Sequence, residues 1–324
     1  MMSYQDVTGI GALNVDLIYE IKDYEPFKGL GLPLEAGREV IAEGRIASVL
    51  KDLLEKRGIL KKVLPGGSAS NTCHMLAKMG YITGLIGVIG DDLEGEFYLE
   101  QTKGVDTSGI IKRGGATGKA YIINTEAKDR SIILFPGSNS AITLDMIYRD
   151  GMKNTKWVHM TSFVTEEAMR VQMEIKSRLM GKVGFSIDPG EVYARMGDKL
   201  YPLIEGVDIL FISEKECEML YGRDLDAAIQ MALKMAKIVV LKRGKMGASV
   251  YAKDLFYTCK AEDVWVVDNT GAGDVLNGVF LGLYSKGASL DAALRAATRA
   301  ASISTTGYGR DAYPDRDQIS LFVD

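Results

Sequence analysis

The chain has 324 residues, of which 47% are hydrophobic and 25% charged, a globular balance that excludes long disordered tracts and fibrous classes. Its net charge is −4, and Lys and Arg are scattered without a basic stripe, so we expect no nucleic-acid partner. Because α/β folds of this length often form one core with a small appendage, we predict a single main domain over residues 1–324.

The cysteines and the N-terminal residues indicate the compartment. Cys73, Cys217 and Cys259 are odd in number and widely separated, which predicts neither a disulfide framework nor a zinc site. The first residues carry no basic or apolar leader, and nowhere do 18 apolar residues follow one another. We therefore expect a cytoplasmic protein that does not associate with membranes.

Short apolar runs rich in β-branched residues alternate with segments of helical period, a pattern typical of a parallel sheet with crossover helices. This predicts an α/β fold of three α/β/α layers around a mostly parallel central sheet. The helices expected first are residues 44–57, residues 68–79 behind a serine cap, and residues 93–103. The candidate core strands are residues 7–13, 81–89, 157–160, 183–187, 208–212 and 238–242.

Two polar residues, Asn14 and Asp16, follow the first predicted strand. The carboxyl end of a strand is the edge where open α/β sheets bind ligands, so these side chains could grip vicinal hydroxyl groups. A turn is the other interpretation of an Asn and an Asp after a strand.

Two segments, about 15–40 and 118–135, depart from the alternation of strands and helices. Within the second, residues 120–124 and 131–135 are typical of a hairpin around the polar turn 126–129. The two segments could pair into a small β lid that excludes water from a reaction site. A plain surface hairpin explains the pattern equally well.

A glycine pair opens the helix predicted from residue 68. Gly66 and Gly67 would let a polyol approach the backbone closely, and Asn71, one turn into the helix, could donate to and accept from hydroxyl groups. Taken alone, the same residues indicate only a serine-capped helix start.

The stretch from Asp268 to Asp274 reads D-N-T-G-A-G-D and lies between a predicted strand, residues 264–267, and a helix of small residues. Its glycines allow successive N–H groups and the helix N-terminus to converge on one anion. At that helix start the dipole would keep the carboxylate of Asp274 ionised, so that it could accept a proton. An isolated motif of this kind is more often a capped turn.

The motif D-x-T-G-A-G-D and, upstream, the stretch from Gly66 to Asn71 resemble the two signatures of the ribokinase (PfkB-type) family of carbohydrate and nucleoside kinases. The resemblance covers nearly the whole chain. It implies an ATP- and Mg²⁺-dependent kinase with Asp274 as the general base and an anion hole made by Gly271, Ala272 and Gly273. The acceptor would be bound by Asn14, Asp16, Gly66, Gly67 and Asn71.

The resemblance also implies the nucleotide and metal contacts. The strand, turn and return strand at residues 238–247 resemble the nucleotide loop of the family, with Lys242, Gly244 and Gly247 as contacts. Glu216 would be tied to Mg²⁺ through water, although Ser213 replaces the usual Asn three residues before it. Asp268 and Thr270 would hold a monovalent cation such as K⁺, as in many members.

The acceptor stays open between a sugar and a ribonucleoside. About fifty residues separate Asp16 from Gly66, a layout similar to the adenosine kinase branch, whose members include sugar kinases. In this family a lid sheet can also form a homodimer interface. A sugar- or nucleotide-binding regulator that has lost catalysis is the alternative from another class.

Overall fold

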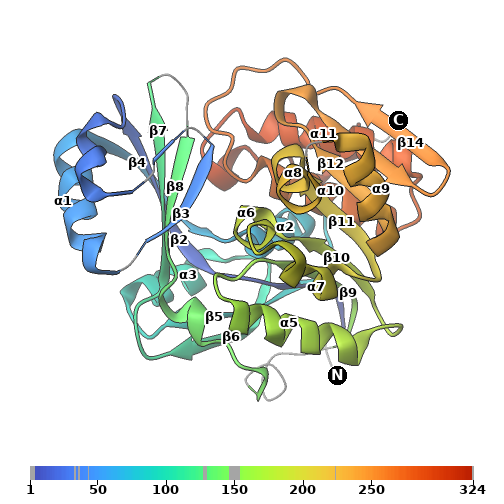
Figure 1. The fold of residues 1–324 in the computed structure, drawn as a ribbon, viewed down its shortest axis with the longest axis horizontal. Coiled ribbons are helices and arrows are strands. Elements are labelled where there is room, and N and C mark those ends of the chain that lie inside the picture. Colours follow the sequence, from blue (N-terminus) through green and yellow to red (C-terminus); the bar gives the residue numbers. More distant parts are fainter. Residues whose placement is uncertain are drawn as a thin grey trace.

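The computed structural model describes residues 4–322 apart from residues 33, 36, 43, 127–129, 146–153 and 223. It contains a nine-stranded and a five-stranded sheet (Figure 1). The larger sheet has the order β14-β13-β12-β11-β10-β9-β1-β5-β6 and is parallel except where β12, β13 and β14 pair antiparallel. Its strands are β1 (Gln5–Ile10), β5 (Thr83–Gly90), β6 (Asp106–Arg113), β9 (Thr155–Thr161), β10 (Gly184–Asp188), β11 (Val207–Ser213), β12 (Ala236–Lys242), β13 (Ala248–Ala252) and β14 (Leu255–Cys259).

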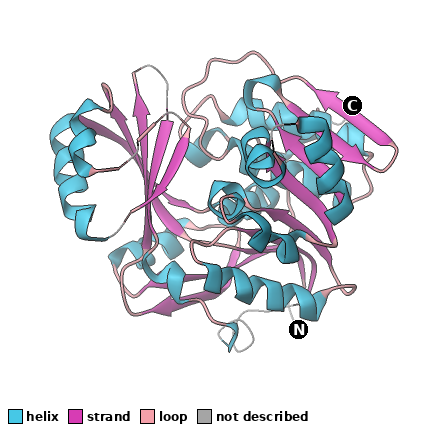
Figure 2. Cartoon of the chain, viewed as in Figure 1, coloured by secondary structure: helices cyan, strands magenta, loops and turns pink. Residues whose placement is uncertain are grey.

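Helices cover both faces of this sheet (Figure 2), and the continuous apolar strands explain why. In β11, Leu210 and Ile212 face the core that contains α5 to α9, whereas Ile209 and Phe211 face the core that contains α2, α10, α11 and α12. A strand buried on both faces has no polar side to alternate with. The predicted three-layer α/β fold is therefore confirmed.

The helices outside the small sheet are α2 (Ser68–Lys78), α3 (Leu93–Gln101), α5 (Glu166–Leu179), α6 (Gly190–Ala194), α7 (Tyr201–Ile204), α8 (Glu214–Tyr221), α9 (Leu225–Met235), α10 (Ala272–Ser285), α11 (Leu290–Ser304) and α12 (Arg316–Ser320). Short 3-10 turns lie at η3 (Gly137–Ala141), η4 (Gly197–Leu200), η5 (Gly244–Met246) and η6 (Gly309–Ala312). No helix in the described part of the chain is long and apolar enough to span a bilayer.

The five-stranded sheet has the order β3-β8-β7-β2-β4 and stands edge-on beside the main body in Figure 1. Its strands are β2 (Asn14–Ile21), β3 (Arg38–Ile41), β4 (Gly58–Gly66), β7 (Gly118–Thr125) and β8 (Arg130–Phe135). The segments connecting β2 to β4 contain η1 (Glu25–Leu30), η2 (Gly44–Ile46) and α1 (Ala47–Arg57). Residues 127–129 of the predicted hairpin turn, and residues 33 and 36 of the first lid segment, lie outside the described residues.

The two faces of the small sheet have different neighbours. Tyr121 and Ile123 on β7 pack in one core with Leu50 and Leu54 of α1. The alternate residue Ile122, like Ile132 and Leu134 of β8, faces a cavity in front of the main domain. Successive side chains of a strand point to opposite faces, so one strand supports its helix and lines the cavity at once.

Three local expectations were wrong. The first strand ends at Ile10, and Asn14 and Asp16 lie on β2 of the small sheet, because the chain leaves the main sheet at Gly11. The helix from Ser68 is capped by Gly67, whose φ is 96°, without a side-chain cap. Residues 264–267 form no strand, since the amides of Val267 and Asp268 both donate to the Thr305 carbonyl instead of continuing a ladder.

Candidate active site

The glycine-rich stretch ends at the start of α10. Gly271 is the N-cap residue, and its φ of 79° lies in the left-handed region that favours glycine. Amide groups in the first turn of a helix lack intrahelical acceptors, so this turn can offer N–H donors to an anion. Asp274 is the third residue of the helix, and its side chain is only 8% exposed.

The carboxylate of Asp274 lies in a buried polar environment. Asn71 Nδ2 donates to Asp274 Oδ2 over 2.8 Å. Burial raises the pKa of Asp274 to about 7, and the negative charge of Asp188 also raises it, whereas the Asn71 hydrogen bond and Lys242 lower it. Desolvation therefore opposes the helix dipole, which we expected to keep this carboxylate ionised.

Asn71 is already engaged with protein groups. Its Oδ1 accepts a hydrogen bond of 3.0 Å from Arg310 Nε, while its Nδ2 donates to Asp274. Asn71 lines the cavity, so an acceptor hydroxyl would share its amide with these two protein partners.

The glycine pair makes room mainly for protein atoms. A Cβ atom at Gly66 would lie 2.0 Å from Asp16 Oδ1, and one at Gly67 would lie 2.1 Å from the Ala12 carbonyl oxygen. Gly66 thus lets the Asp16 carboxylate lie against the backbone. Gly67 lines the cavity, and Gly66 is not among its lining residues.

A cavity of about 230 Å³ lies between the small sheet and the carboxyl ends of the main strands. Asn14 and Asp16 line its small-sheet wall, while Asp274, Gly271 and Gly273 line the opposite side. Burial raises the pKa of Asp16 to about 7 against the opposing positive charge of Arg310. The structure therefore brings the separated N- and C-terminal motifs to one cavity.

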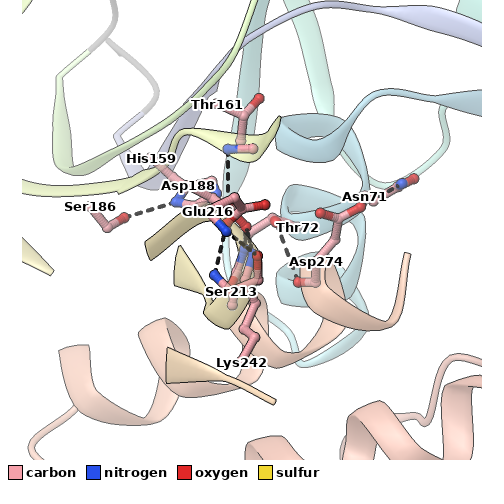
Figure 3. A network of polar contacts seen from close by, with 12 residues as sticks. Asn71, Thr72, His159, Thr161, Ser186, Asp188, Ser213, Glu216, Lys242 and Asp274 are labelled. Carbon is pink, nitrogen blue, oxygen red and sulfur yellow. Dashed lines mark hydrogen bonds and ion pairs between the residues drawn. The ribbon is translucent and has the colours of Figure 1, made fainter. Parts of the chain in front are cut away.

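A buried ion pair between Lys242 and Asp188 lies beside Asp274 (Figure 3). Lys242 forms an ion pair with Asp188, whose Oδ2 also accepts from Asn277 Nδ2 over 2.6 Å. Burial acts to raise the pKa of Asp188, but Lys242 outweighs it and holds that pKa low. Burial acts to lower the pKa of Lys242, and the surrounding carboxylates raise it overall.

A larger cavity of about 620 Å³ adjoins the first. Lys242, Gly244 and Gly247 line it, as do Gly273 and the apolar residue Val264. Gly247 has a φ of 92°, and a Cβ there would lie 1.9 Å from the Cys259 carbonyl oxygen. Val264 and Val266, misjudged as a strand, form part of this wall, which explains their apolar character without strand pairing.

Ser213 and Glu216 form a capping box at the start of α8. Glu216 Oε2 accepts from the Ser213 amide over 2.8 Å, and the Glu216 amide donates to Ser213 Oγ. Burial raises the pKa of Glu216, which Lys242 lowers and Asp188 raises further. Glu216 lines the smaller cavity together with Asp188.

Asp268 accepts hydrogen bonds from within the glycine-rich motif. Its Oδ1 accepts from the Thr270 amide and, over 2.7 Å, from the Thr270 hydroxyl, whereas its Oδ2 is buried with no partner among the described residues. Arg130 Nη1 on β8 donates to Thr270 Oγ1 over 3.3 Å. The small sheet thus contacts the motif directly.

Sequence reasoning missed four residues of this site, which are Arg130, Asp188, Asn277 and Arg310. Asp188 ends a buried strand, so the rule applied to Asn14 and Asp16 would have found it. The other three lie on a hairpin, inside a helix and in a 3-10 turn, where no local pattern distinguishes them from surface or core residues.

Comparisons with known proteins agree with this geometry. A family model described as "pfkB family carbohydrate kinase" matches residues 60–316. The chain belongs to this family. It is accordingly an ATP-dependent phosphotransferase with a hydroxyl acceptor.

Proteins similar to this pfkB kinase are named after several different acceptors. An uncharacterized sugar kinase of Archaeoglobus fulgidus is 32% identical over 221 residues, which are 67% of this chain and 88% of that protein. The ATP-dependent ribose-1-phosphate kinase of Halopiger xanaduensis is 27% identical over 271 residues, 80% of this chain and 86% of that one. The adenosine kinase structure from Sinorhizobium meliloti superposes with a TM-score of 0.83 at 22% identity, covering 99% of both chains.

Proposed function

We propose that this kinase transfers the γ-phosphoryl group of ATP to a hydroxyl of an uncharged sugar, with Asp274 as the general base. The placement of Asp274 carries the proposal. Its carboxylate lines the smaller cavity, and Lys242 and Gly273 line both that cavity and the larger one. A hydroxyl in the smaller cavity would meet the base on one side and a nucleotide phosphate from the larger cavity on the other.

The acceptor would be held by Asn14, Asp16 and Gly67 along the smaller cavity. Asp274, with a pKa of about 7 raised by burial, is suited to accept a proton near neutral pH. The anion hole of Gly271, Ala272 and Gly273 would then stabilise the charge on the transferring phosphoryl group. Lys242, Gly244 and Gly247 would contact the nucleotide.

The charges around the smaller cavity favour an uncharged acceptor. Its lining residues include five carboxylic acids and two cationic side chains, Arg130 and Lys242. Lys242 is paired with Asp188, and Arg130 contacts Thr270 at the border of the larger cavity. A phosphate or carboxylate on the acceptor would add negative charge to a wall where acids outnumber cations, and Arg130, which contacts a hydroxyl, is the one described lining cation left to meet it. The acids are Asp16, Glu39, Asp188, Glu216 and Asp274.

A ribonucleoside is the second candidate acceptor, and the apolar walls of the cavity favour it. Ile122, Ile132 and Leu134 line the small-sheet side, and Phe163 and Val192 line the main domain. Apolar walls beside a few convergent polar groups suit a flat base attached to a hydroxylated ring. The uncharged character of the acceptor is the same in both cases.

Two cation sites belong to the proposal. Glu216 and Asp188 both line the cavity, and such hard oxygen donors fit a Mg²⁺ ion that keeps several waters and is otherwise held by phosphates. The buried Oδ2 of Asp268, which has no partner in the described part of the chain, fits a monovalent cation such as K⁺, because a buried carboxylate oxygen needs a compensating partner. Bound Mg²⁺ supplies charge neutralisation to the transferring phosphoryl group.

We further propose that the small sheet acts as a lid. Its inner face lines the acceptor cavity, and Arg130 reaches the catalytic motif. Covering the cavity would exclude water, which otherwise competes with the acceptor for the phosphoryl group.

An ADP-release screen tests the acceptor class. With Mg²⁺ and ATP, we expect uncharged pentoses, hexoses or nucleosides to give kcat/KM at least about 10²-fold above that of their phosphorylated or carboxylated analogues, from the cost of an unpaired buried charge. Ribose against ribose 1-phosphate is the most direct matched pair. Equal or better use of the anionic member would contradict the uncharged acceptor, and a complete absence of ADP would contradict the kinase itself.

The pH dependence of kcat/KM tests the assignment of the base. We expect activity to fall below about pH 7 with a slope steeper than one proton, because Asp274 and Asp16 both have a pKa of about 7 raised by burial and both must be ionised. The Asp16→Asn variant should keep a shallower, one-proton limb that lies at lower pH, because each of the two carboxylates raises the pKa of the other. A flat profile between pH 5 and 8 would rule out an acidic group with this pKa.

A further inference from the structure

Arg310 lies in η6, far along the chain from α2. It is a buried arginine whose three guanidinium nitrogens differ in their hydrogen-bond partners. Nε donates to Asn71 Oδ1 over 3.0 Å, and Nη2 donates to Ser70 Oγ over 2.8 Å. Nη1 is buried with no partner among the described residues. The side chain is only 9% exposed and is not among the residues that line the acceptor cavity, so it acts through its neighbours.

The hydrogen bond from Arg310 fixes which way the Asn71 amide points. With Oδ1 accepting from the guanidinium, Nδ2 is the group that faces Asp274 Oδ2 at 2.8 Å. In the flipped amide, an NH₂ group would meet an N–H donor, and a carbonyl would meet the carboxylate. Both contacts would be repulsive. Arg310 therefore makes Asn71 a donor to the base.

The same guanidinium also acts on the acceptor side. Burial raises the pKa of Asp16, and the positive charge of Arg310 is the first influence that opposes it, while Asp274 and Asp268 raise it further. Asp16 is the carboxylate that lines the acceptor wall of the cavity. The charge of Arg310 thus also influences a carboxylate on the acceptor side of the cavity.

We propose that Arg310 is a positioning residue: through Asn71 it fixes the hydrogen bond to the base Asp274. This inference rests on the proposed function for the role of that carboxylate. The contacts themselves join η6, α2 and α10, which come together only in the folded chain.

Other charged groups near Asp274 also shift its pKa, and a test must separate their effects from that of Arg310. Asp188 of β10 raises the pKa of Asp274, and Lys242 of β12 lowers it. Asp16 of β2 and the buried Tyr313 hydroxyl are the remaining titratable groups that interact with it. Arg310 is not in contact with Asp188 or Lys242 in the described structure, so an effect of Arg310 that disappears without Asn71 would have to pass through Asn71.

Direct titration of Asp274 by carboxyl-carbon NMR is the decisive experiment, with the resonance assigned by its loss in Asp274→Asn. In Arg310→Gln we expect the midpoint to move up by about one pH unit, the size of one hydrogen bond to a charged group. In the Asn71→Leu background the same arginine change should move it by less than about a third of that. The exposed neighbour change Asp311→Asn is the matched control and should move nothing, since Asp311 pairs with Lys62 at the surface.

The conservative variant separates the charge of Arg310 from its geometry. Arg310→Lys keeps a positive charge but lacks the planar fork that orients the amide, so the Asp274 midpoint should still rise. If Arg310→Gln does not fold, Arg310→Lys carries the titration. An unmoved midpoint, or an equal shift with and without Asn71, would overturn the proposal. Because the titration needs no turnover, an enzyme that releases no ADP would refute the proposed function alone.

Discussion

The Asp274→Asn variant is expected to turn over its acceptor about 10² to 10⁴ times more slowly than wild type, the usual contribution of a general base. The amide cannot accept the hydroxyl proton, yet its carbonyl can still accept the 2.8 Å hydrogen bond from Asn71. The local structure and the nucleotide cavity should therefore be preserved. Single-turnover phosphoryl transfer, measured beside the Kd of ATP, checks both statements.

The stability of the same variant provides its internal control. The folded-state pKa of Asp274 is raised above its ordinary value to about 7 by burial, so this group destabilises the folded wild type progressively as pH rises from about 4 to about 7. Asn carries no charge to bury. Relative to wild type, Asp274→Asn should gain free energy of unfolding across that window. Near-normal turnover, or lost stability at pH 8, would sink the assignment of a buried base.

The sequence predicted the layers of the fold better than its edges. Runs such as Ile209 to Ile212 are apolar at every position, and only a sheet covered on both faces accommodates them. The strand β4, which contains the exposed Ile59 and Leu60, was missed because it lies at the edge of the small sheet. The apolar run 264–267 was misjudged because Val264 and Val266, which line a cavity, give it the composition of a strand.

The site divides in a similar way. Motif residues that need a special backbone conformation, such as Gly271 with its positive φ, can be recognised from the sequence because glycine is the residue that adopts it readily. The sequence pointed only to an acceptor contact for Asn71, and its hydrogen bond with Arg310 was missed because the two residues lie 239 positions apart. No periodicity joins two such residues. The same limit applied to the charge state of Asp274, because desolvation depends on everything packed around it.

Replacing Lys242 by Met is expected to cost about 3 to 5 kcal/mol of unfolding free energy, the usual penalty for removing one partner of a buried ion pair. Lys242 and Asp188 have side chains 16% and 6% exposed, and in the variant Asn277 and the Gly190 amide would remain hydrogen-bonded to the carboxylate without any positive charge to balance it. Turnover should also fall by about 10² to 10³, because Lys242 lines both cavities and its charge would face the transferring phosphoryl group. Chemical denaturation and steady-state kinetics measure the two effects separately.

The double variant Asp188→Asn with Lys242→Met shows whether the positive charge of Lys242 serves the stability of the fold or also the phosphoryl transfer. It removes the uncompensated carboxylate, so most of the lost stability should return, whereas turnover should stay low because the positive charge is still missing. The stability gap between Lys242→Met and wild type should also narrow as pH falls. Asp188 has a depressed folded-state pKa in wild type, held down by Lys242 against the effect of burial, and therefore loses its stabilising contribution in acid, while the variant can protonate the carboxyl group. Recovery of turnover in the double variant would mean that Lys242 serves only to neutralise Asp188.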